Sequence, residues 1–321
     1  MPWNAINTIK NKKPAGGGLI VNWVAGGTGS NTIATSSDGI AWRGVTQNGG
    51  VNSNVQGVAY GNGIWVAVGN GSNTIATSTD GITWTGVTAN GGLNTRGYGV
   101  AYGKDNTGAG LWVAVGSGGN NIVTSSDNGT TWTGVTANGG ITNSLYSAGV
   151  AYNGIGRWVA VGSGSNTIAT STNGTSWTGV TANGGITQGR GVAYGNGRWV
   201  AIGEGGASFA YSDTGTSWTA ASSNGSITTY GFGVAYGDNL WVGVGGGTGI
   251  IAYSTTSGTS WTAGSPKGGL TFGRGVAYGN GRWVAVGDTT TIVTGTNGTG
   301  WAAATSNGGL SSNGHGVAFK N

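Results

Sequence analysis

The sequence contains no cysteine and few charged residues. Of its 321 residues none is Cys, and only 7% are Asp, Glu, Lys or Arg, against about a quarter in an average globular domain. Without thiols the chain can form no disulfide, no thiolate nucleophile and no cysteine-ligated metal site. Only one His and one Glu accompany seven Asp. We therefore expect neither a metal site nor a cofactor.

Long apolar runs and dense positive charge are also missing. No apolar stretch approaches the ~18 residues that a membrane-spanning helix needs, so we expect no membrane insertion. Residues 1–18 lack the apolar segment of a secretory signal. The net charge is +5, but Lys10, Lys12 and Lys13 lie in that N-terminal arm, which leaves ten basic and eight acidic residues elsewhere. Because nucleic-acid binding requires a dense basic surface, we predict no nucleic-acid partner.

Glycine and aromatic residues are plentiful instead. The chain has 73 Gly, 15 Trp and 11 Tyr, together with regular runs of Val, Ile and Ala. Disordered sequences lack such aromatic and β-branched residues. Short β-branched runs separated by Gly and Asn are typical of strands joined by tight turns. The composition therefore predicts an all-β globular protein.

One unit of sequence occurs seven times. Each copy carries two tryptophans, spaced by 40–48 residues from their equivalents in the next copy, which is the length of a four-stranded propeller blade. The first series is Trp23, Trp65, Trp112, Trp158, Trp199, Trp241 and Trp283, and the second is Trp42, Trp84, Trp132, Trp177, Trp218, Trp261 and Trp301. We predict a seven-bladed β-propeller over residues 19–321, preceded by a basic arm at residues 1–18.

The second copy shows the four strands expected of each blade. Residues 57–60 form strand A, 65–68 strand B, 74–77 strand C and 83–87 strand D. The Gly-Asn-Gly turn at 61–63 suits a tight hairpin, whose central residues need positive φ.

The two ends of the chain predict how the ring closes. The first copy lacks a strand A, whereas residues 316–319 form a strand A with no copy after it. We expect this C-terminal strand to complete the first blade, because a closed ring leaves no exposed sheet edge. An open solenoid is the alternative, but its repeats are shorter and need capping units.

Tryptophans at equivalent places in every copy have two interpretations. They could be stacking platforms for sugars, or large rings that fill the space between blades. Burying an aromatic ring removes roughly 150–250 Å² from water. Because both series recur in all seven copies, packing explains them better than ligand binding does.

The turn between strands C and D carries a recognisable motif. Ser125 to Trp132 read S-x-D-x-G-x-T-W, and Asp38 and Asp80 occupy shorter versions of the same turn. This motif resembles the Asp-box, or BNR repeat, of sialidases, sortilin-like receptors and photosystem assembly factors, which implies a propeller. The place of the aspartate is taken in the remaining copies by Asn173, Thr214, Thr256 and Asn297.

The substitutions in this turn favour a structural role. Asp, Asn and Thr can all accept hydrogen bonds from backbone N–H groups and close a turn, whereas a metal or catalytic role would require one chemistry. The resemblance to sialidases also implies an arginine cluster, a tyrosine nucleophile and acidic partners. Here Glu204 and Asp288 fall in expected B–C loops of non-adjacent blades, so a pair of catalytic carboxylates is hard to build. We therefore predict no enzymatic activity, with a glycosidase as an alternative.

The copies differ most just before strand A. There the sequence reads x-Gly-x-Gly-Val-Ala, and the two x positions, here called the variable pair, fall where strand D is expected to connect to the next strand A. Residues two apart on a strand point to the same side. Arg, Tyr, Phe, Gln, Asn and His are typical of binding surfaces. The predicted ligand-binding residues are Asn54, Gln56, Arg96, Tyr98, Tyr146, Gln188, Arg190, Tyr230, Phe232, Phe272, Arg274, Asn313 and His315.

These features predict a non-enzymatic, multivalent binding module for a glycan or a cell-surface receptor, with weak sites around the ring adding to useful avidity. The near-identical, uncharged repeats resemble surface proteins of virions and phage tails, which implies a virion-associated or extracellular location. A structural or assembly protein is the alternative, docked to a protein partner through residues 1–15, which include Trp3.

Overall fold

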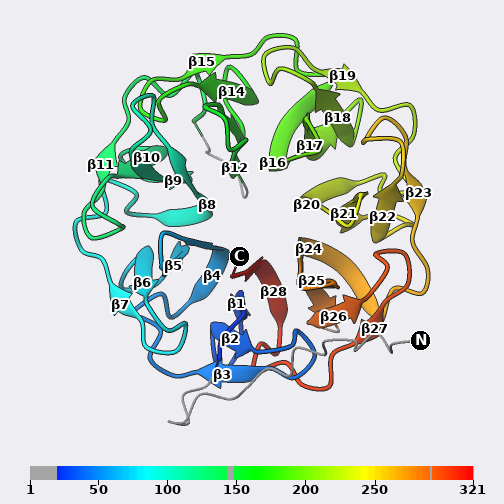
Figure 1. Ribbon diagram of the computed structural model, residues 1–321, viewed down its shortest axis with the longest axis horizontal. Helices are drawn as coiled ribbons and strands as arrows, with labels where there is room; N and C mark the ends of the chain where they lie inside the picture. Colours follow the sequence, from blue (N-terminus) through cyan, green and yellow to red (C-terminus); the bar gives the residue numbers. More distant parts are fainter. Residues whose placement is uncertain (1–19, 143–147, 290, 321) are drawn as a thin grey trace, which may run out of the picture.

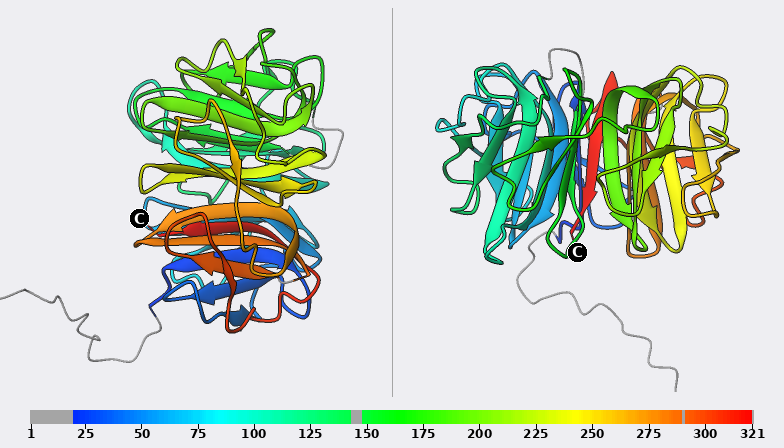
Figure 2. Two further views of the ribbon diagram at one scale, coloured as in Figure 1. Left: turned by 90° about the vertical axis from the view of Figure 1, so that its right-hand side faces the viewer. Right: turned by 90° about the horizontal axis from the view of Figure 1, so that it is seen from above.

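The computed structural model describes residues 20–142, 148–289 and 291–320. Antiparallel sheets are arranged around a central axis (Figure 1). Seen edge-on, the strands run between the two faces of a disc (Figure 2). The chain is thus an all-β, seven-bladed propeller, as its repeats predict. No helix that could cross a membrane occurs in the described ranges.

Each blade has four strands, A to D from the axis outward. In blades 1 to 7, strand A is β28 (Asn313–Phe319), β4 (Asn54–Gly61), β8 (Arg96–Lys104), β12 (Gly149–Tyr152), β16 (Ile186–Gly195), β20 (Tyr230–Gly237) and β24 (Leu270–Gly279). Strand B is β1 (Trp23–Thr28), β5 (Ile64–Asn70), β9 (Gly110–Ser117), β13 (Trp158–Val161), β17 (Arg198–Gly205), β21 (Leu240–Gly246) and β25 (Arg282–Thr289).

The outer strands are shorter. Strand C is β2 (Ile33–Ser36), β6 (Ile75–Ser78), β10 (Ile122–Ser125), β14 (Ile168–Ser171), β18 (Phe209–Ser212), β22 (Ile251–Ser254) and β26 (Ile292–Gly295). Strand D is β3 (Arg43–Val45), β7 (Thr85–Gly86), β11 (Thr133–Gly134), β15 (Thr178–Gly179), β19 (Thr219–Ala220), β23 (Thr262–Ala263) and β27 (Ala302–Ala303). Strand D is therefore briefer than the sequence predicts, because the second tryptophan lies before it.

The C-terminal strand closes the ring. β28 pairs with β1 in antiparallel register, with Trp23 opposite Phe319 and Ala25 opposite Val317. Figure 1 shows the last strand of the chain lying inside the first strand. This confirms the predicted closure, although β28 begins three residues earlier than expected. Residues 1–18, the predicted basic arm, lie outside the described residues.

Tryptophans fill the spaces between blades. The first series is at most 1% exposed and the second 3–5%, so both series are packing residues and neither offers a free face to a sugar. In blade 3, for example, Trp112 packs on Val66 and Val68 of blade 2. It also lies 5.1 Å from the ring of Tyr102. Burying each ring contributes up to a few kcal/mol at ~25 cal/mol per Å².

The C–D turns keep one hydrogen-bond pattern despite their different residues. In blade 1, Oδ1 of Asp38 accepts from the amides of Ile40 (2.8 Å) and Ala41 (3.0 Å). Asn173 accepts from the two equivalent amides at 3.0 and 2.9 Å, and the hydroxyl of Thr256 accepts from the amide of Ser260 at 3.1 Å. The prediction that Asp, Asn and Thr all serve to close this turn is confirmed.

Candidate functional site

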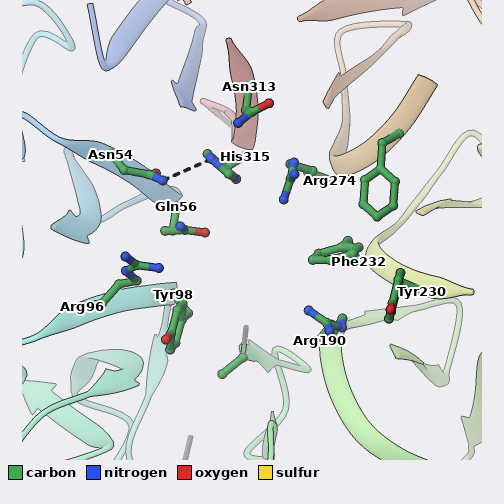
Figure 3. Close-up of a pocket in the computed structure, with 12 residues that line it drawn as sticks. Asn54, Gln56, Arg96, Tyr98, Arg190, Tyr230, Phe232, Arg274, Asn313 and His315 are labelled. Carbon is green, nitrogen blue, oxygen red and sulfur yellow. Dashed lines mark hydrogen bonds between the residues drawn. The ribbon is translucent and has the colours of Figure 1, made fainter. Parts of the chain in front are cut away.

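A single cavity opens where the seven inner strands begin, at the mouth of the central channel. Its volume is about 460 Å³, within the range of small-molecule sites. Every blade contributes to its wall, as Figure 3 shows for most of the side chains. This central pocket is lined by Asn54, Gln56, Arg96, Tyr98, Ala148, Arg190, Tyr230, Phe232, Phe272, Arg274, Asn313 and His315.

The structure brings most of the variable pairs together here. Eleven of the thirteen predicted residues line the central pocket. Gln188 is not among the lining residues, and Tyr146 lies outside the described part of the chain. Blade 4 contributes Ala148 instead. We expected several similar sites spread around the ring, whereas the pairs form one composite cavity, because all seven inner strands converge on the axis. Ligand binding by these residues stays a prediction.

In every blade but the fourth, the variable pair lies within strand A and not on the D-to-A connection that we expected, whereas Ala148 of blade 4 precedes β12. In β8 the pairing with β9 shifts register between Gly97 and Gly99, which makes Tyr98 an extra residue in a β-bulge. The same shift falls at Arg190 in β16 and at Arg274 in β24. A bulge bends a strand and redirects its side chain. In these blades it thereby aims the second member of the pair into the central pocket, a role that simple strand alternation does not predict.

Arg190 is held by a carboxylate of its own blade. Its side chain is 7% exposed, and it forms an ion pair with Glu204, at the end of the neighbouring strand β17. Nε of Arg190 donates to Oε1 of Glu204 at 2.8 Å. The guanidinium also lies over the ring of Phe232, at 4.4 Å from its centroid, and 5.3 Å from the ring of Tyr230. A buried guanidinium is stable here because a carboxylate and an aromatic face both compensate its charge.

Arg274 repeats this arrangement in blade 7. It donates to both carboxylate oxygens of Asp288, at 2.7 and 3.1 Å. Asp288 is further held by Asn313, whose amide, in the orientation that satisfies its hydrogen-bonding groups, donates to Oδ1 at 2.9 Å. Such a bidentate ion pair, supported by Asn313, compensates the charge of Arg274 and also fixes the orientation of its guanidinium group. Arg274 also lies 5.2 Å from the ring of Phe272.

Three aromatic rings form one side of the pocket. Phe232 and Phe272 meet edge to face at 5.1 Å between ring centroids, and Tyr230 lies 6.4 Å from each of them. Tyr230 is 38% exposed, which is unusual for a large apolar side chain in this protein. Figure 3 shows Phe232 and Tyr230 grouped with Arg190, away from Gln56, Arg96 and Tyr98. The pocket therefore has an aromatic half and a polar half.

His315 is a buried histidine of this site. The side-chain amide of Asn54 lies 3.2 Å from its Nε2 atom (Figure 3). Burial, followed by the nearby positive charges of Arg274 and Arg96, lowers the pKa of His315 to about 4 against the opposing influence of Asp288. The imidazole therefore adds no charge to the pocket at neutral pH.

Sequence analysis missed the two carboxylates that support the pocket. Glu204 and Asp288 do not lie in B–C loops but are the second-to-last residues of β17 and β25, which extend to pair with the bulged inner strands. The sequence contains a pattern that could have predicted them. Only blades 5 and 7 carry Arg as the second member of the variable pair, and only these two blades have an acid near the end of strand B.

Deeper in the channel the wall becomes uniform. Seven Gly-Val pairs, one from each inner strand, enclose a narrower space of about 190 Å³. Within the described ranges no group of three or more His, Asp or Glu residues is placed to hold a metal ion. The chemical variety of the channel is thus confined to its mouth.

Comparison with known proteins identifies the fold only. No protein-family model and no curated protein sequence matches the chain. Among solved structures, it is similar to the computationally designed Ika8 protein (TM-score 0.59, 12% identity, covering 95% of this chain and 92% of that one). It is also similar to the Niastella koreensis GH74 enzyme (TM-score 0.56, 20% identity, covering 90% of this chain and 44% of that one). A third similar structure is YCF48 from Cyanidioschyzon merolae (TM-score 0.52, 15% identity, covering 83% of this chain and 93% of that one).

These identities are too low to carry function from one protein to another. The chain spans less than half the length of the GH74 enzyme, so that enzyme has a large part with no counterpart here. What the similarities establish is the β-propeller architecture.

Proposed function

We propose that this propeller is a non-enzymatic recognition module that binds a glycan, such as one displayed by a cell-surface receptor, in its central pocket. The observation that carries the proposal is convergence. The positions at which the seven blades differ most are the ones that line a single cavity of ligand size. One composite pocket favours one ligand per chain over a site on every blade.

The chemistry of the lining supports recognition. Aromatic faces such as Phe232 and Tyr230 can pack on the apolar face of a sugar ring, while Gln56 and Asn54 offer directional hydrogen bonds. Rigid aromatic side chains bind with little loss of conformational entropy. A glycan, which combines apolar faces with many hydroxyl groups, matches this mixture.

The carboxylates argue against a hydrolase. A glycosidase needs one carboxylic acid that donates a proton and a second carboxylate that acts as base or nucleophile. Here Glu204 and Asp288 are each engaged by an arginine through two nitrogen atoms. Both carboxylates are thereby held against arginines of the pocket wall, and neither is among the residues that line the pocket itself.

A glycan array tests the proposal. We expect the wild-type protein to bind a limited set of glycans, and Tyr98→Ala combined with Tyr230→Ala to lose that binding by at least tenfold. Ile155→Ala is the matched control, because Ile155 is 81% exposed on a turn outside the pocket. Unchanged binding by the double tyrosine variant would exclude the central pocket, and turnover of any bound glycan would exclude a purely non-enzymatic role.

A further inference from the structure

The three arginines of the central pocket are not equivalent. Arg190 and Arg274 are each paired with a carboxylate at the end of the adjoining strand B. In blade 3, by contrast, Arg96 lies opposite Ser117, the last residue of strand B (β9). Among the residues that the structure describes, no carboxylate lies within ion-pairing distance of Arg96. Arg96 therefore carries the one positive charge of the pocket that the described protein leaves uncompensated.

The net charge of the pocket also indicates one uncompensated positive charge. Three guanidinium groups and two carboxylates surround it, and His315, whose pKa is about 4, is neutral at pH 7. One positive charge remains, at the polar half. A partly buried cation with no partner attracts an anion more strongly than an exposed one does, because water screens it less. The planar fork of a guanidinium also matches an oxyanion in a bidentate manner.

The surroundings of Arg96 restrict the ligand further. Tyr98 and Gln56 lie beside it and can hydrogen-bond to a polar group, whereas the opposite side of the pocket is the aromatic half (Figure 3). A ligand that fills about 460 Å³ must therefore present an anionic end to Arg96 and an apolar face to Phe232 and Tyr230. A second negative charge on the ligand would find no uncompensated cation.

We propose that Arg96 anchors the ligand, and that this ligand is a sugar residue with one carboxylate or one sulfate group whose ring face packs on the aromatic half. This inference rests on the proposed function, since it names the class of glycan that the pocket binds. Arg190 and Arg274 then act as positioning residues. They orient the aromatic rings and make no ion pair with the ligand.

Four small probes test the assignment by NMR titration. Methyl β-glucuronide carries a carboxylate, methyl β-glucoside is its neutral match, methyl β-glucoside 6-sulfate carries a sulfate, and benzoate is an anion with an aromatic face but no sugar. We expect the glucuronide or the sulfate to bind at least tenfold more tightly than the glucoside. Arg96→Gln should remove about that tenfold difference and leave the glucoside unaffected. A preference between the two anionic sugars identifies the oxyanion.

Arg43→Gln is the matched control, because it removes one arginine that is exposed on β3 outside the pocket. Its binding should equal that of the wild type, and thermal melts should show that both variants fold. If the glucoside and the glucuronide bind equally well, and Arg96→Gln changes neither affinity, Arg96 does not anchor an anionic group, although the pocket still binds a sugar. Arg96-dependent binding of benzoate alone would retain the anchor and overturn the sugar. No binding of any probe would overturn both.

Discussion

The C–D turns differ between blades at one position and the variable pairs at two, and the two regions vary in different ways. In the turns, Asp, Asn and Thr replace one another, and each accepts a hydrogen bond from the amide of the residue that precedes the second tryptophan. In the variable pairs, Arg, Phe, Tyr, Gln and His bring different charges and shapes into one cavity. Variation alone therefore does not indicate a binding site. A binding site is indicated where the residues that replace one another cannot make the same interaction.

The largest effect should come from breaking a pocket ion pair. Glu204→Gln leaves Arg190, which is 7% exposed, without a counter-charge. We expect the free energy of unfolding to fall by about 2–3 kcal/mol, since the loss of one partner strands a buried charge. Denaturant titration measures this. Asp213→Asn, which affects the more exposed pair with Arg198, should change stability by less than about 1 kcal/mol. Equal effects of the two substitutions would contradict the supporting role of Glu204.

A smaller effect is expected at the shared serine of the turns. Oγ of Ser78 accepts from the buried amide of Gly81 at 2.8 Å, and Ser78→Ala leaves that amide without a partner. Unfolding should require about 1–2 kcal/mol less free energy. Ser37→Ala, at an exposed position in the C–D turn of blade 1, should be neutral in the same denaturant titration. A neutral Ser78→Ala would show that the turn does not depend on this bond.

Replacing the aspartate of a turn should matter less still. Burial of Asp127 raises its pKa, but hydrogen bonds from the hydroxyl and amide of Thr131 and from Ser125 outweigh burial and lower the pKa to about 2. This carboxylate therefore stabilises the fold above its ordinary pKa of 3.8, and the contribution is lost as the pH falls toward 2.

Asp127→Asn should remove that part of the acid sensitivity and change stability at pH 7 by less than about 1 kcal/mol. Blade 4 already carries Asn173 at this position. Thermal melts between pH 2 and 7 measure both quantities. A large loss of stability at neutral pH would mean that the aspartate does more than close the turn.

At neutral pH the smallest effect on stability, and the sharpest spectroscopic one, concerns His315. It is the only histidine, so its NMR titration needs no assignment by mutation. We expect a pKa of about 4. Arg96→Gln should raise that pKa, because it removes a positive neighbour, whereas Arg43→Gln should not. Since the unfolded pKa is near 6.5, His315 also makes the fold less stable as the pH falls from 6.5 to 4. A pKa near 6.5 in the folded protein would place His315 in water.

Residue patterns predicted the blades well and the pocket wall in part. The bounds of strand A were predicted as 57–60 in blade 2, whereas β4 covers Asn54–Gly61. The difference arises because a bulge at Gln56 lets pairing with β5 continue past the regular register. A period-two pattern cannot reveal a bulge, since the extra residue interrupts the period itself.

The repeated residues alone predict the number of blades, the role of both tryptophan series, the closing strand and the positions at which the blades differ. These are properties of a repeat, and they can be recognised within each copy. The three-dimensional arrangement is needed to show that the differing positions share one cavity, that Arg190 and Arg274 are neutralised, and that Arg96 is not. Those facts depend on ring closure, which brings strands more than 200 residues apart, such as β4 and β28, side by side around one axis.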